Sequence, residues 1–320
     1  MTAAAPATQG LPDDVLAARR LSAGFAALVS VTFCLIVLGA LVRAHDAGLA
    51  CPDWPLCFGE LVPQMNLEVA FEWSHRVLAG SVSLGFITLA LLTLRQPATR
   101  SRCAGLLAVG ALLLGVQVVL GGLTVLQLLA SWTVTSHLIT GNAFAVALLW
   151  TALTLREIGS PESAPIASAQ PVLRNAILAS AVLLVLQMVL GGLVSSRYAG
   201  LVCPEWPTCN GGVWFPSFRG PVGVHLLHRL NGYALVLALF ATAALAWRSS
   251  PALRRLTSVA AALCLSQVAV GVANVLLALP VEVTGLHTAL AAALVLTLSV
   301  AVREALRRDK PTPAMLQTTP

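Results

Sequence analysis

Four of the six histidines in this chain recur at a fixed spacing, and their positions suggest a site that holds an iron centre. His75 and His228 are 153 residues apart, and His137 and His287 are 150 residues apart. Each lies near the start of an apolar run, where an ionisable residue is costly in a membrane and is usually functional. Two imidazoles on facing helices suit axial ligation of a haem iron inside a helical bundle.

Zinc is the alternative metal for these histidines. It takes four ligands, or three protein ligands and a water molecule. Two histidines per repeat fall short of that number unless loop cysteines contribute, and oxidised cysteines cannot ligate. The pattern therefore favours haem over zinc.

A carboxylate accompanies only one of the two repeats. Glu72 stands three residues before His75, on the same face of a helix, whereas His225 occupies the equivalent place before His228. Beside a haem, a carboxylate can act as a general base or stabilise a developing positive charge. A solvated carboxylate at the membrane edge is the simpler alternative. The difference suggests that the N-terminal half reacts and the C-terminal half holds a cofactor.

An arginine follows the first histidine of each repeat, as Arg76 and Arg229. Either side chain can snorkel to the lipid interface. Either can also pair with a carboxylate, and the propionates of a haem are such partners.

Four of the seven cysteines form two Cys-x5-Cys pairs, Cys51 with Cys57 and Cys203 with Cys209. A structural disulfide within each loop is favoured over a reactive thiol pair, because reactive pairs more typically have the spacing Cys-x-x-Cys. Cross-pairing between the two loops also agrees with the sequence.

The elements that position these residues follow from the composition. The chain has 320 residues, of which 58% are hydrophobic and 10% are charged. Soluble domains carry about 25% charged residues, so an ordinary soluble protein, a disordered chain and a nucleic-acid module are excluded. A helical protein embedded in lipid remains. The apolar runs span residues 22–44, 71–94, 104–126, 132–155, 172–194, 222–247, 256–279 and 282–304.

Basic residues predict the orientation of these spans. When successive loops alternate between the two sides, 14 of the 19 Lys and Arg residues fall on one side. The positive-inside rule places that side in the cytoplasm, together with both termini. The long loops 45–70 and 195–221 then face outward, where disulfides are permitted.

Internal similarity predicts how the spans are grouped. Residues 47–57 and 199–209 are identical at eight of eleven positions. We therefore expect an all-α integral membrane protein whose eight transmembrane helices form two pseudo-symmetric four-helix bundles in parallel repeat. The predicted parts are an N-terminal tail (1–21), an N-terminal half (22–155), a linker (156–171), a C-terminal half (172–305) and a C-terminal tail (306–320).

The segment Glu72-Trp73-Ser74-His75-Arg76 resembles the Glu-x-x-His-Arg signature of haem A synthases. The resemblance extends over residues 20–306 and includes the other three recurrent histidines and both Cys-Pro-acid-Trp-Pro-x-Cys loops. It implies an enzyme that oxidises the C8 methyl of haem O to the formyl group of haem A. Two successive hydroxylations are implied, and the product serves haem–copper oxidases.

The resemblance also implies a role for each site residue. Glu72 would be the catalytic carboxylate, His75 and His137 would flank the substrate haem O, and a permanent haem b would be bound by His228 and His287. It further implies the plasma membrane, with a haem O synthase and oxidase assembly factors as partners. The electron acceptor is not named by the sequence, and a homo-oligomer is left open.

Three other functions are compatible with parts of the pattern. A diheme b-type membrane cytochrome needs the same four histidines but gives Glu72 no role. A membrane thiol oxidoreductase would use the loop cysteines. A transporter would place polar residues near mid-membrane, whereas the ionisable residues here cluster at the ends of the runs.

Overall fold

The structure is a computed structural model that describes residues 13–160 and 169–307. Within these residues, all regular secondary structure is helical apart from two isolated bridges in the long loops. The helices are α1 (Asp13–Ala44), α2 (Leu67–Arg95), α3 (Pro97–Leu126), α4 (Ser131–Ile158), α5 (Pro171–Ser196), α6 (Gly220–Ala246), α7 (Pro251–Leu276) and α8 (Val281–Ala305). All eight are long and apolar enough to cross a membrane, which confirms the predicted number of spans.

Helix ends differ from the ends of the apolar runs because capping residues set them. Proline stands in the first turn of α3, α5, α6 and α7, where its missing N–H is not needed. The largest difference is at α1, which begins at Asp13 and so extends into the predicted tail. Residues 1–12 lie outside the described part. So do residues 161–168 and 308–320, which cover half of the predicted linker and most of the predicted C-terminal tail.

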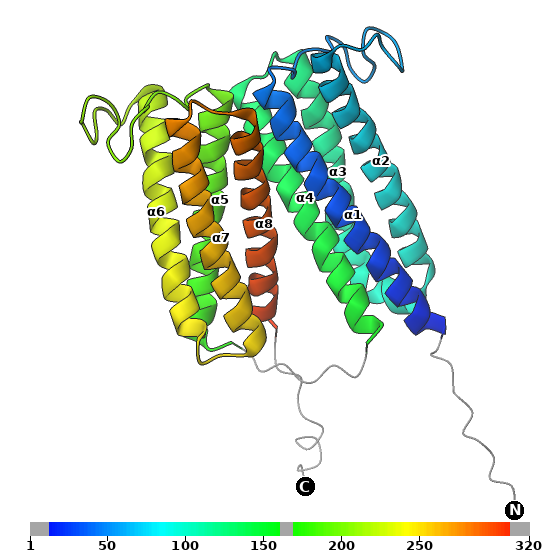
Figure 1. The fold of residues 1–320 in the computed structure, drawn as a ribbon. Coiled ribbons are helices and arrows are strands. Elements are labelled where there is room, and N and C mark those ends of the chain that lie inside the picture. Colours follow the sequence, from blue (N-terminus) through cyan, green and yellow to red (C-terminus); the bar gives the residue numbers. More distant parts are fainter. Residues whose placement is uncertain (1–12, 161–168, 308–320) are drawn as a thin grey trace, which may run out of the picture.

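The helices pack as two rings of four (Figure 1). In one ring α1 contacts α2 and α4, and α3 completes the ring by contacting α2 and α4; α5 to α8 form the other ring in the same way. The rings meet where α4 contacts α5 and α8 and where α1 contacts α8. Both long loops lie at one end of the molecule, and the start of α1 and the end of α8 lie at the other (Figure 1).

Apolar side chains fill the half of each bundle that lies away from the long loops. Phe25, Phe86 and Phe144 belong to the buried core of the first bundle, and Phe86 and Phe144 meet edge to face with centroids 5.5 Å apart. The corresponding core of the second bundle includes Leu239 and Leu298. The polar residues singled out in the sequence therefore belong to the loop-side half of each bundle.

Close contacts between the loops and the helix ends recur at the spacing of the repeat. A Cβ atom added to Gly48 would lie 3.3 Å from the side chain of Leu129, and one added to Gly200 would lie 2.8 Å from Leu279. In both places the absence of a side chain lets the loop lie against the turn that precedes α4 or α8. The two loops are thus seated in the same manner.

Ion pairs join the two bundles at the end opposite to the long loops. Glu157 of α4 accepts hydrogen bonds from Arg303 of α8 at 2.7 Å and from Arg307 at 2.8 Å. Arg102 of α3 approaches the second oxygen of Glu157 at 3.3 Å. Glu157, Arg303 and Arg307 are partly buried, so Glu157 acts as a shared acceptor at the contact between the bundles.

Replacing Glu157 with alanine should lower the stability of the protein, because it leaves partly buried guanidinium groups without their shared acceptor. We expect a loss of about 1–3 kcal/mol, between the values for surface and buried ion pairs. Thermal denaturation of the purified protein in detergent measures it. Glu60→Ala, at an exposed loop position, is the matched control. Equal melting of the two variants would contradict a joining role for Glu157.

Candidate functional site

The structure places all four recurrent histidines at the end of the molecule that carries the long loops. Each lies about two turns below the start of its helix, and these helices all begin at the loop end (Figure 1). Within each ring, the two histidine-bearing helices stand at opposite corners. Each half therefore presents two imidazoles at one level from two opposite helices.

Each of these histidine rings lies against a glycine of the preceding helix. An added Cβ would crowd the ring at Gly39, Gly191 and Gly271, whereas at Gly121 it would lie at ordinary contact distance. The pairs, with the distance from a Cβ added at the glycine to the ring Cε1, are Gly39–His75 at 3.0 Å, Gly121–His137 at 3.5 Å, Gly191–His228 at 3.0 Å and Gly271–His287 at 3.1 Å.

Hydrogen bonding at these rings is incomplete within the described residues. The Nδ1 atoms of His75, His137 and His287 are buried without a partner, although the side chains as a whole are only partly buried. Nδ1 of His228 lies 3.2 Å from the amide nitrogen of Gln187. Neutral imidazole nitrogens on opposite helices fit an iron whose other four ligands come from a porphyrin. Among the described residues, no three His, Cys, Asp or Glu gather as a metal site.

Glu72 is buried and is held between its helix and the first loop. One carboxylate oxygen forms an ion pair with Arg76, and the other accepts a hydrogen bond of 2.9 Å from the backbone N–H of Cys51. Arg76 also donates to the backbone carbonyls of Cys51, Asp53 and Leu56. The pair therefore fastens the loop over the bundle and fixes the carboxylate one turn from His75.

His225 takes the place of Glu72 in the second half. Its Nε2 accepts a hydrogen bond of 3.1 Å from Arg229, and its Nδ1 donates to the carbonyl of Ala199 at 2.8 Å. Arg229 donates to the carbonyls of Cys203 and Thr208, at 2.7 and 3.0 Å. Both arginines thus anchor loops, by the same carbonyl contacts, and their pairing with propionates stays a prediction.

The cysteines pair within each loop. The sulfur atoms of Cys51 and Cys57 lie 1.97 Å apart, and those of Cys203 and Cys209 lie 2.01 Å apart. All four residues are at most 2% exposed. The geometry agrees with the intra-loop pairing favoured from the sequence and keeps the sulfur atoms away from solvent.

The acidic residue of each cysteine motif organises the turn that follows it. Asp53 accepts a hydrogen bond of 2.7 Å from the N–H of Gly59, which lowers the pKa of its carboxyl below the ordinary 3.8. Glu205 accepts one of 2.7 Å from the hydroxyl of Thr208 and one of 2.9 Å from the N–H of Gly211. These bonds likewise lower the pKa of Glu205.

Some parts of the site were not predicted. Gly39 and Gly271 carry no local sequence signal, and only their register with the other contact glycines identifies them. Asn231 donates a hydrogen bond of 2.8 Å to the amide oxygen of Gln187, and the amide nitrogen of Gln187 lies beside the ring of His228. A remaining histidine, His45, stacks on Phe71 at 4.3 Å between ring centroids.

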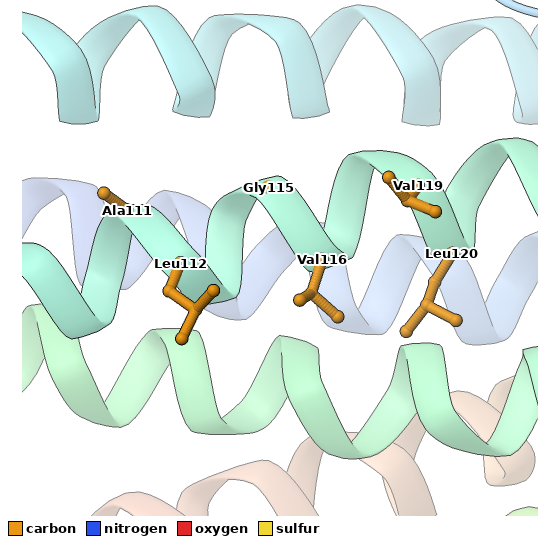
Figure 2. A pocket seen from close by; sticks show the side chains of 6 residues that line it. All are labelled: Ala111, Leu112, Gly115, Val116, Val119 and Leu120. Carbon is orange, nitrogen blue, oxygen red and sulfur yellow. The ribbon is translucent and has the colours of Figure 1, made fainter.

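A shallow, open apolar hollow lies on the largely exposed face of α3 (Figure 2). It extends from the middle of the helix to the residue before Gly121. Its lining residues are Ala111, Leu112, Gly115, Val116, Val119 and Leu120. The surface is open and almost free of polar atoms, as the lipid-facing side of a membrane-spanning helix is.

The fold and site define a multi-pass helical membrane protein with paired histidines near one end of each bundle. Residues 24–299 match the family model COX15-CtaA, described as cytochrome oxidase assembly protein. The match covers most of the sequence. The chain belongs to this family.

Curated relatives cover most of the chain as well. Heme A synthase of Shewanella oneidensis is 30% identical over 308 residues, covering 83% of this chain and 91% of that protein. Heme A synthase of Caulobacter vibrioides is 30% identical over 332 residues, covering 89% and 94%. Heme A synthase of Symbiobacterium thermophilum is 31% identical over 250 residues, covering 76% and 81%.

Asp53 should make the first long loop less stable at acidic pH. The pKa of Asp53 is lower in the folded protein than in the unfolded chain. The ionised carboxylate therefore stabilises the folded protein fully above pH 3.8, and this stabilisation is lost as pH falls through the lowered pKa. Asp53→Asn should therefore reduce the loss of thermal stability between about pH 5 and pH 3. Melting in detergent across this range measures it, with Asp46→Asn at an exposed position as control. Identical acid dependence in wild type and Asp53→Asn would refute this account.

Proposed function

We propose that this protein acts as a haem A synthase, which oxidises the C8 methyl of haem O to a formyl group. Family membership and the names of the curated relatives support this function. The observation that carries the mechanism is the buried Glu72, fixed by Arg76 one turn from His75. In the other half the equivalent position is His225, whose imidazole accepts a hydrogen bond from Arg229.

The two halves divide the work in this proposal. His75 and His137 flank the substrate haem O, and His228 and His287 hold a resident haem b. The contact glycines support both sites, because they position the histidine rings by packing. The Nδ1 atoms of His75, His137 and His287 are buried without a partner among the described residues, so packing alone holds these rings. When bound, haem b supplies a redox centre for a reaction that side chains alone cannot perform.

In this mechanism Glu72 is the side chain that assists oxidation of the substrate methyl group. Conversion of a methyl group to an aldehyde removes four electrons, which two successive hydroxylations and loss of water from a geminal diol accomplish. A carboxylate at a fixed position can accept a proton or stabilise positive charge developing on the substrate. Its contacts with Arg76 and the N–H of Cys51 hold it in place throughout.

Packing of the loop and helices suits an amphiphilic substrate. The clamped loop covers the bundle end and limits access of water to Glu72. The apolar outer face of α3, with its shallow hollow, lets the farnesyl tail lie in a hydrocarbon environment (Figure 2). We place both loops outside the plasma membrane and both termini in the cytoplasm, with the pseudo-twofold axis along the membrane normal. The charge distribution and the recurring loop contacts support this arrangement.

A thiol oxidoreductase is less compatible with the geometry. A reactive cysteine needs an accessible thiolate, whereas Cys51 is fully buried and its partner Cys57 is 2% exposed. We propose that both pairs are structural disulfides. A haem O synthase and oxidase assembly factors remain the proposed partners, and the electron acceptor is undefined.

Glu72→Gln should abolish most haem A formation, because it removes the charge while keeping an acceptor for the N–H of Cys51. We expect a loss of at least about 100-fold, the usual contribution of a general base. Haems extracted from cells that also supply haem O are quantified by chromatography and mass. Glu60→Gln, at an exposed site in the same loop, is the control. Wild-type amounts of haem A from Glu72→Gln would disprove the catalytic role.

His228→Ala and His287→Ala should each remove the low-spin haem b signal, because each deletes one axial ligand. The reduced-minus-oxidised absorbance spectrum and electron paramagnetic resonance of the purified protein measure it. His45→Ala provides a control at a histidine that stacks on Phe71. A haem b spectrum that survives both substitutions would remove these residues from the ligand set.

A further inference from the structure

Two adjacent glycines near the end of α5 contact histidine-bearing helices of both halves. A Cβ atom added to Gly191 would lie 3.0 Å from the ring of His228 in α6. One added to Gly192 would lie 2.8 Å from Cγ2 of Thr135 in α4, the helix that carries His137. Successive residues of a helix point about 100° apart. One short segment of α5 therefore faces a histidine of its own half and a histidine-bearing helix of the other half.

The contact at Gly192 involves the rigid part of the Thr135 side chain. Cβ and Oγ1 of Thr135 would each lie 3.3 Å from the added atom, besides Cγ2 at 2.8 Å. Rotation about χ1 moves Oγ1 and Cγ2 but leaves Cβ in place, because the backbone fixes Cβ. A methyl group at Gly192 would therefore displace α4 itself.

A buried hydrogen bond joins the same two helices. Oγ1 of Thr135 lies 3.3 Å from Oγ of Ser196, and the two residues are 6% and 5% exposed. Arg43 of α1 also donates a hydrogen bond of 3.0 Å to the carbonyl of Ser195. The end of α5 is thus held by two helices of the first half.

The position of Thr135 in α4 connects this contact to the site in the first half. Thr135 stands two residues before His137, so the two side chains point about 200° apart around the helix. Thr135 faces α5, whereas the ring of His137 lies against Gly121 of α3. A displacement of α4 relative to α5 would therefore change where His137 lies within the first bundle.

The equivalent contact joins α8 to α1. Gly285 stands two residues before His287, and a Cβ added to Gly285 would lie 3.0 Å from Cδ2 of Leu41. Both α4 and α8 therefore meet the other half two residues before their histidine. Here the nearest atom is the end of a flexible side chain, so the contact at Gly192 is the stricter of the two.

We propose that α5 positions one histidine in each half: Gly191 seats His228, and Gly192 with Thr135 sets the place of His137 across the contact between the bundles. Gly192 is then a positioning residue for the first half, although it belongs to the second. Groups that orient a ligating histidine typically contribute about 10–100-fold in affinity. The inference rests on the proposed function for the assignment of haem O to the first half and haem b to the second.

The test compares the haems held by purified variants after co-expression with a source of haem O. Haem b and the farnesylated haems are extracted and quantified by mass per polypeptide, and the low-spin haem b signal is recorded by difference absorbance. Gly192→Ala should lower the farnesylated haem by about 10-fold or more and leave haem b unchanged. Gly191→Ala should do the reverse, because the atoms nearest to its added Cβ belong to the ring of His228.

A second substitution should reverse the effect of Gly192→Ala. Thr135→Ser removes Cγ2 and keeps the hydroxyl that contacts Ser196, so the double variant G192A/T135S should regain most of the farnesylated haem. Gly105→Ala is the matched control, at an exposed helical glycine where an added Cβ meets no other atom within 4 Å. Should Gly192→Ala fail to accumulate, Thr135→Ala removes the same contacts from the α4 side and should also deplete only the farnesylated haem.

Unchanged farnesylated haem in Gly192→Ala would overturn the inference. Equal loss of both haems would also overturn it, since a contact that only stabilises the fold affects both halves alike. Failure of Thr135→Ser to restore the farnesylated haem would count equally against it.

The proposed function fails separately if the wild-type protein holds no farnesylated haem when haem O is supplied. The inference then still requires Gly191→Ala and Gly192→Ala to deplete different haem signals. Loss of the same signal in both variants would overturn it.

Discussion

Close contact between a histidine ring and a glycine on the preceding helix organises the loop-side half of both bundles. A large ring near the end of a lipid-embedded helix needs room among tightly packed neighbours, and a missing side chain provides it. The contact occurs four times, always near the loop end. Apolar cores fill the opposite half of each bundle. The packing therefore sets both the level of the imidazoles and the helices from which they project.

The loops complete this arrangement through one arginine each. Arg76 and Arg229 bind equivalent backbone carbonyls, but the helix partner is the buried carboxylate Glu72 in one half and the imidazole of His225 in the other. The same scaffold thus carries a carboxylate beside this arginine in only one half. In the proposed function, this difference distinguishes a reacting half from a half that holds a cofactor.

Much of this organisation follows from sequence patterns that report burial in lipid. Long apolar runs predicted all eight helices, and the repeat spacing predicted which histidines lie at equivalent positions. Helix ends were less predictable, because polar residues such as the aspartates in the first turn of α1 extend the helix beyond the apolar run. The contacts of Arg76 were not predictable, since its acceptors include backbone carbonyls that any residue supplies. The role of Asn231 depends on the register between two helices, which periodicity does not report.

The central claim is that the chain processes a farnesylated haem at Glu72. Its most direct test is mass analysis of haem extracted from the purified protein after co-expression with a source of haem O. The account predicts haem O, its hydroxylated form or haem A alongside haem b. Haem b alone, with haem O available, would contradict it and favour an electron-transfer cytochrome.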